Sequence, residues 1–198
     1  MYTGQESIPL YGKMTPFGPF IEGFYMVDAL KKVRYKELII AVILLVATNI
    51  ALTVAWFPVL DWVNLIFHEA GHSVFFWAGE FLNVLGGTLG QLLVPLVMGI
   101  YFIRKGKWIA ALAMLWWVGQ NFVGIGLYAG DARVQALDLI GGDHDWTYLL
   151  GRLGLINKDL MIANIFDGIA KVLMGTSIGI LLVRGLYPAY RALKSSQN

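Results

Sequence analysis

Three stretches of 23 residues contain no charged side chain, and they constrain the fold more than any other feature of this sequence. They are residues 38–60, 81–103 and 108–130. At a rise of about 1.5 Å per residue, a helix of this length crosses a hydrocarbon layer of about 30 Å. The 198 residues are 58% hydrophobic and only 14% charged, and a soluble core cannot hide so much apolar surface. The sequence therefore predicts an all-α, polytopic integral membrane protein with four to five transmembrane or re-entrant helices.

Two further apolar segments complete this helical membrane domain, which we predict over residues 37–187. Residues 160–183 contain only two charged side chains, Asp167 and Lys171, whose spacing of four allows them to pair on one helix face. Residues 62–79 form the fifth segment. We expect residues 1–36 to be an interfacial or cytoplasmic segment and residues 188–198 to be a tail.

The amino-terminal segment differs from a secretory signal peptide, because no apolar core follows Met1 and three prolines interrupt the first 20 residues. Residues 20–36 combine aromatic and aliphatic side chains with four Lys and Arg residues. This mixture predicts a helix on an anionic membrane surface, and the alternative is a solvated leader without membrane contact. The basic residues also predict a cytoplasmic amino terminus in an inner or cytoplasmic membrane.

Charge distribution argues against five full crossings. Five crossings would put the basic residues of segments 104–107 and 184–194 outside, contrary to the positive-inside rule. One segment between residues 62 and 103 that enters and returns on the same side removes the conflict. Residues 82–91, rich in glycine and amide side chains, are the better candidate in this region for a broken or re-entrant segment. The alternative is an ordinary helix in which Gly86 and Gly90 form a packing face.

An HExxH motif, His68-Glu69-Ala70-Gly71-His72, lies inside the fifth apolar segment. On a helix the two imidazoles lie one turn apart on one face and can bind one divalent ion, for which zinc is the expected metal. Glu69 can then act as general base toward a metal-bound water. A bound metal also compensates the cost of ionisable groups in an apolar layer. The alternative is a helix end whose histidines and Glu69 only form hydrogen bonds at the interface.

A catalytic zinc ion usually takes three protein ligands, so a third must come from elsewhere in the chain. The candidates are His144, Asp131 and Asp167, and each has a simpler interpretation as a solvated, capping or paired side chain. The two glycines before Asp143 allow that loop to fold back onto a helix. Asp143 or Asp145 then becomes a partner that orients the imidazole of His144.

Together these features resemble the site-2-protease family of intramembrane zinc metalloproteases. The resemblance implies His68 and His72 as ligands, Glu69 as base and membrane-anchored substrates. Asn164 and Asp167-Gly168 match a later element of that family only loosely, because its prolines are absent. The chain is also similar to a smaller branch of HExxH membrane proteins, which favours His144 and Asp131 over Asp167 as third ligand. The matching elements are residues 86–91, 116–120, 131–133 and 144–146.

The sequence thus predicts an intramembrane zinc metallopeptidase whose partners are membrane lipids and a membrane-anchored protein substrate. Five uncharged amides are candidates to bind an oxyanion or a substrate backbone, or to join helices by hydrogen bonds: Asn64, Asn83, Gln91, Gln120 and Asn121. A catalytically silent scaffold subunit, in contact with partner membrane subunits, and a small ion-handling transporter are the alternatives. The chain has no cysteine, and a net charge of +2 does not suggest nucleic acid binding.

Overall fold

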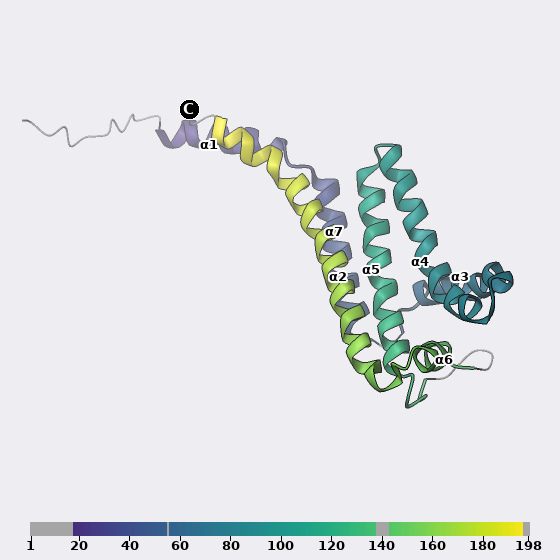
Figure 1. The fold of residues 1–198 in the computed structure, drawn as a ribbon. Helices are drawn as coiled ribbons and strands as arrows, with labels where there is room; N and C mark the ends of the chain where they lie inside the picture. The colour runs from purple at the N-terminus through teal and green to yellow at the C-terminus, as the bar shows by residue number, and fades with distance from the viewer. Residues whose placement is uncertain (1–17, 55, 138–142, 196–198) are drawn as a thin grey trace, which may run out of the picture. The chain divides into compact units, whose positions relative to one another are not determined.

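A computed structural model describes residues 18–54, 56–137 and 143–195, and these residues form helices and connecting turns without any strand. The predictions for residues 1–17 lie outside the described part. Figure 1 labels the helices α1 to α7, and two short 3-10 turns, η1 and η2, precede α4 and α7. The elements in chain order are α1 (Gly18–Lys31), α2 (Tyr35–Thr53), α3 (Leu60–Phe75), η1 (Phe76–Ala78), α4 (Glu80–Arg104), α5 (Trp108–Gly130), α6 (Asp145–Arg152), η2 (Ile156–Lys158) and α7 (Asp159–Ser195).

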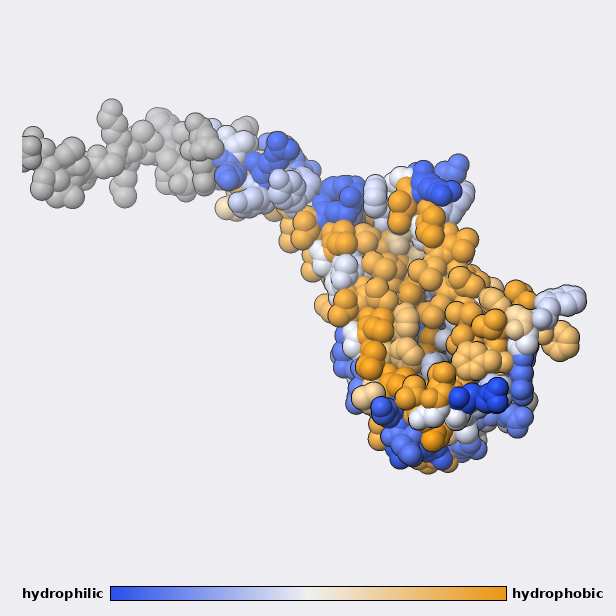
Figure 2. Space-filling model, viewed as in Figure 1, coloured by the Kyte–Doolittle hydropathy of each residue, from blue (hydrophilic) through white to orange (hydrophobic). Residues whose placement is uncertain are grey.

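Four helices among the described residues are long and apolar enough to cross a membrane. They are α2, α4, α5 and the stretch Ile156–Ser195, which contains α7. The prediction of an all-α chain with several candidate membrane spans is confirmed at this level. Figure 2 shows the corresponding surface over α4 and α5, where a broad apolar zone separates a polar end at the α4–α5 turn from a polar end around α6.

The chain divides into two compact units, residues 35–183 and residues 1–34 with 184–198. In the larger unit, α2, α5 and α7 share a core that includes Ala41, Leu112 and Met174. A second core joins α6 to α5, with Ile125, Trp146 and Leu149 among its buried members. Lys171 pairs with Asp167 at 2.5 Å along α7, which confirms the pairing expected from their spacing.

Helices α3 and α4 form an antiparallel hairpin whose backbones approach closely at glycines. A Cβ atom at Gly71 would lie 2.0 Å from the carbonyl oxygen of Gly86, and one at Gly90 would lie 2.3 Å from that of Phe67. Such an approach is available only to residues without a side chain. Residues 82–91 therefore lie in a continuous helix of 25 residues, with Gly86 and Gly90 as its packing face.

Of the two interpretations left open for residues 82–91, the packed helix is the one found and the broken segment is wrong. The segment that falls short of a membrane span is instead α3, which carries the HExxH motif and has 16 residues. At about 1.5 Å per residue it extends about 24 Å, less than the hydrocarbon thickness. Its first residues follow Val59, whose φ of 69° marks a sharp change of chain direction.

The smaller unit contains α1 and the end of α7. The backbone N–H of Arg34 donates a hydrogen bond to the carbonyl of Gly185 at 3.0 Å, which fixes the residues after α1 against α7. Ala29 of α1 is buried, whereas Tyr25, Met26 and Leu30 are exposed. Exposed apolar and basic side chains together are the composition expected of an interfacial segment.

Candidate metal centre

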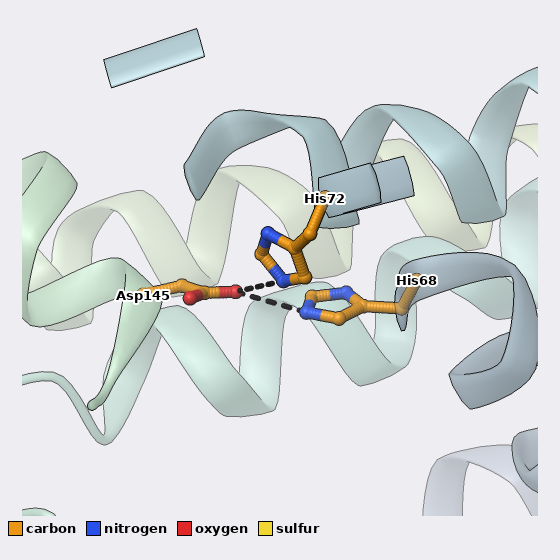
Figure 3. A group of neighbouring side chains, drawn as sticks. All are labelled: His68, His72 and Asp145. Carbon is orange, nitrogen blue, oxygen red and sulfur yellow. Dashed lines mark hydrogen bonds and ion pairs between the residues drawn. The ribbon is translucent and has the colours of Figure 1, made fainter. Parts of the chain in front are cut away.

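The two histidines of α3 point toward one carboxylate from another part of the chain (Figure 3). His68 Nε2 lies 2.9 Å from Asp145 Oδ2, and His72 Nε2 lies 3.3 Å from the same oxygen. The donor atoms of the three residues all lie within 4.8 Å of one another. A helix thus supplies two ligand atoms one turn apart, and the first residue of α6 supplies the third.

These separations suit a small tetrahedral cation. Two ligand atoms at 2.0–2.1 Å from a tetrahedral zinc ion are roughly 3.3 Å apart. The two contacts of Asp145 at 2.9 and 3.3 Å are close to that spacing. Two nitrogen donors and one carboxylate oxygen also form a donor set typical of catalytic zinc sites, which leave one position for water or substrate.

The second ring nitrogen of His72 fixes its tautomer. Nδ1 lies 2.9 Å from the backbone carbonyl oxygen of Asn83, which only accepts hydrogen bonds, so Nδ1 carries the proton. In neutral His72 the lone pair of Nε2 therefore faces the carboxylate oxygen of Asp145. Two lone pairs at this distance repel one another unless a proton or a cation lies between them. The side-chain amide of Asn83 donates in turn to the His72 carbonyl at 2.7 Å and stabilises the arrangement.

A glycine of α4 leaves room beside the donor atoms. A Cβ atom at Gly87 would lie 2.5 Å from His68 Nε2 and 2.6 Å from His72 Nε2. No side chain other than hydrogen fits there while both imidazoles keep their positions. The adjacent Gly86 faces the backbone of α3 instead, so the two neighbouring glycines have different functions.

The loop between α5 and α6 holds Asp145 through contacts at both of its ends. The backbone N–H of Asp145 donates to the hydroxyl oxygen of Tyr128 at 3.1 Å. The hydroxyl of Thr147 donates to the carbonyl oxygen of Ala132, across the base of the loop. Arg133 forms an ion pair of 2.7 Å with Asp159 at the start of α7, and this pair secures the same loop.

His144 and Asp131 interact with each other rather than with the histidines of α3. His144 is 4% exposed, stacks on the ring of Tyr128 at 4.3 Å, and accepts the backbone N–H of Thr147 at Nδ1. Its Nε2 must then carry the proton, and Asp131 Oδ2 lies 3.5 Å away. His144 thus caps α6 with its side chain, while the next residue, Asp145, contacts the histidines of α3.

Asp131 terminates α5 and shapes the loop that follows. Its carboxylate accepts the backbone N–H groups of Ala136 and Leu137 at 2.9 and 3.0 Å. Burial raises the pKa of Asp131, but these hydrogen bonds and the nearby His144 outweigh burial and hold the pKa below its ordinary value. Asp131 is therefore a carboxylate that organises the backbone.

The structure brings Asp145 to His68 and His72, and it brings neither His144, Asp131 nor Asp167 there. Asp167 pairs with Lys171 on α7. The sequence had suggested Asp145 only as a partner of His144. The side-by-side residues His144 and Asp145 diverge because the former caps a helix and the latter is its first residue, and nothing in the spacing reveals this.

A cavity of about 650 Å³ opens beside the three ligand residues. Glu69 lines it next to His68 and is exposed, which suits a base that must reach a water molecule. The cavity is lined by four acidic side chains and no Lys or Arg, and several amides face it as well. The polar lining residues are Asp61, Asn64, His68, Glu69, His72, Asn83, Gln91, Asn121, Tyr128, Asp143 and Asp145.

Most of the candidate amides take part in hydrogen bonds between helices. Asn64 donates to Gln120 at 2.8 Å and accepts the indole N–H of Trp117 at 2.8 Å. Gln120 donates in turn to Asp61 at 2.7 Å. Asn121 donates to the carbonyl of Trp117, while its Oδ1 is buried without a partner among the described residues. The polar network between α3 and α5 therefore fixes the orientation of the motif helix.

Comparison of the chain with family models, with curated proteins and with solved structures found no match. Assignment of a function to the centre therefore rests on its own geometry and chemistry.

Proposed function

We propose that this protein is an intramembrane zinc metallopeptidase that hydrolyses a peptide bond of a membrane-associated polypeptide, as the resemblance to site-2 proteases implies. The observation that carries the proposal is the convergence of His68, His72 and Asp145 beside Gly87. In neutral His72 the lone pair of Nε2 faces the carboxylate oxygen of Asp145, which a bound cation would bridge, and the spacing of the donor atoms suits zinc.

The residues around the centre supply the remaining chemistry. A zinc ion bound there would lower the pKa of a coordinated water toward about 7 and polarise a scissile carbonyl. Glu69, which lines the cavity beside His68, would accept a proton from that water and deliver it to the leaving amine. Tyr128 accepts the N–H of Asp145, so its own hydroxyl proton is available to the carbonyl oxygen of the substrate.

The four candidate spans give a consistent topology when α3 does not cross. With α2, α4, α5 and α7 as crossings, Lys36, the basic α4–α5 turn and Arg191 all lie on the cytoplasmic side. The metal centre then belongs to the opposite half of the membrane. Gly87 is seven residues into α4, or about 10 Å along the helix from Glu80. A substrate bond must therefore reach this depth.

Metal analysis tests the first half of the proposal. Purified wild-type protein should contain one zinc ion per chain, and the His68→Ala variant should contain none. Inductively coupled plasma mass spectrometry measures the zinc content. Absence of any stoichiometric divalent metal from the wild type would refute both the enzyme and a metal-retaining scaffold. Zinc lost with His68 also argues against a simple transporter, whose cation route would not depend on this side chain.

Cleavage assays test the second half. Wild-type protein in liposomes should cleave one or more of a panel of single-span reporter proteins, and Glu69→Gln should abolish cleavage while it retains zinc. Glu80→Gln is the matched control, because Glu80 does not line the cavity. Bound zinc with no cleavage of any reporter by the wild type would favour the scaffold alternative. Equal cleavage by wild type and Glu69→Gln would exclude Glu69 as the base.

A further inference from the structure

Basic residues are concentrated in the smaller unit of the chain. Residues 1–34 and 184–198 contain seven Lys and Arg against three Asp and Glu, whereas the remaining 149 residues contain eight against ten. A net positive segment next to a membrane span attracts anionic lipids, whose headgroups lie at that depth. The question is whether this unit only carries diffuse charge or also holds a shaped site.

A hollow of about 410 Å³ lies in this unit between the end of α1 and the last turns of α7. Lys32, directly after α1, and Arg191 of α7 line it, and the side chains of Tyr187 and Ser195 supply hydroxyl groups. We propose that this hollow binds the phosphate headgroup of an anionic phospholipid. The proposal does not depend on the metal centre.

The donors of the hollow match a phosphate. Arg191 has no carboxylate partner among the described residues, so its planar guanidinium is free to bind two phosphate oxygens. Lys32 pairs with Asp28 at 3.0 Å, but an ammonium group has three donors and can bind an anion as well. Ser195 donates its hydroxyl to Ala192, which leaves Tyr187 as the hydroxyl donor for the ligand.

The position along α7 favours a lipid over a soluble phosphate. The last residue of the apolar run is Val183, and Tyr187 and Arg191 follow it by about 6 and 12 Å along the helix. Each polar layer of a bilayer is about 5–7 Å thick, so Tyr187 lies at headgroup depth, and Arg191, one turn further out, lines the same hollow. Exposed apolar side chains on the same two helices, including Leu30, Leu186 and Tyr190, suit contact with the acyl boundary.

Lipid titration of the purified, delipidated full-length chain tests the proposal. Dioleoyl phosphatidylglycerol and dioleoyl phosphatidylcholine are added separately in a neutral detergent, and bound lipid is counted by native mass spectrometry. We expect one phosphatidylglycerol to bind in preference to phosphatidylcholine. Arg191→Gln and Lys32→Gln should each weaken its binding about fivefold. Lys194→Gln and Lys31→Gln are matched controls, because they remove the same charge at neighbouring positions that do not line the hollow, and they should change binding less than twofold.

Three results would overturn the proposal. Equal loss of binding in all four variants would show diffuse attraction without a site. Equal binding of the two lipids would show that the anionic headgroup is not recognised. Inorganic phosphate that competes at the same concentration as phosphatidylglycerol would identify a soluble anion as the ligand. Helical content measured by circular dichroism confirms that each variant is folded, and an unfolded variant is replaced by the Arg191→Lys or Lys32→Met change at the same position.

Discussion

Helix α3 and the start of α6 contribute donors to the same centre, but they position them by different means. Helix geometry alone sets His68 and His72 one turn apart. Asp145 reaches them only because Tyr128 accepts its backbone N–H and Thr147 closes the loop onto Ala132. Two of the three donors are therefore determined by local spacing, and the third by tertiary contacts. Substitutions on the two sides should differ accordingly.

Removal of the Asp145 carboxylate should have the largest effect on metal binding. We expect Asp145→Ala to weaken zinc affinity more than 100-fold, because loss of even an outer partner of a ligand costs 10–100-fold. Asp143→Ala is the matched control: it removes a neighbouring carboxylate that lines the cavity but makes no contact with the histidines. Competition with a chelator measures both affinities. Stoichiometric zinc in Asp145→Ala, or an equal loss in Asp143→Ala, would contradict the assignment of Asp145.

Substitution of Gly87 on α4 should weaken zinc binding nearly as much. It fills the space beside the donor atoms and leaves the ligands themselves unchanged. In Gly87→Ala the new methyl group would lie 2.5 Å from His68 Nε2, so the imidazoles must move. Overpacking of this kind costs about 1–3 kcal/mol, and at the donor atoms it should weaken zinc binding up to about 100-fold.

Gly124→Ala is the control for this substitution, because Gly124 lines the same cavity on α5 and a Cβ atom there meets no neighbour within 4 Å. That change should leave zinc binding unaltered and stabilise α5 by up to about 1 kcal/mol. Thermal unfolding in detergent and chelator competition measure the two quantities. Normal zinc affinity in Gly87→Ala would show that the ion, if bound, lies elsewhere.

The features that could be predicted from the sequence are those set by local spacing, and the features that could not are those set by tertiary contacts. Apolar run lengths predict the candidate spans, because a helix needs a fixed number of residues to cross a bilayer. The HExxH spacing predicts that His68 and His72 meet, and the charges of Asp167 and Lys171 predict their pairing. Each of these rests on residues within a single helix.

The rest depends on how distant segments meet. Gly86 and Gly90 fit equally well in a broken segment or in a packed helix, and only the partner Gly71 decides between them. His144 and Asp145 are both chemically able to bind zinc, and only the start of α6 between them separates a cap from a ligand. Gly87 has no donor atoms, so ligand chemistry alone does not point to it.

Substitution of His144 tests whether this residue binds the metal or only positions Asp145. His144→Phe should preserve the stacking on Tyr128 but lose the cap of α6 and the contact with Asp131. We expect zinc affinity to fall about tenfold, since the change acts through the position of Asp145. The affinity of His144→Phe is compared directly with that of Asp145→Ala in the same chelator assay. Equal losses would restore His144 as a ligand.

The smallest expected effect is on the stability of the protein, and it comes from Asp131, whose carboxylate holds the start of the loop between α5 and α6. Because the pKa of Asp131 is below its ordinary value of 3.8, its ionised form stabilises the folded chain, and this contribution is complete above pH 3.8. Asp131→Asn should therefore destabilise the protein by about 1 kcal/mol at neutral pH, through weakened hydrogen bonds to Ala136 and Leu137. As the pH falls below 3.8, protonation weakens the same bonds in the wild type, and the difference in stability between the two proteins should shrink.

Thermal unfolding of chelator-treated protein between pH 3 and pH 7 measures this difference without interference from metal loss. A difference that stays constant on acidification would show that folding does not lower the pKa of Asp131, and a difference that grows would show that folding raises it; either result would contradict a stabilising carboxylate in the loop.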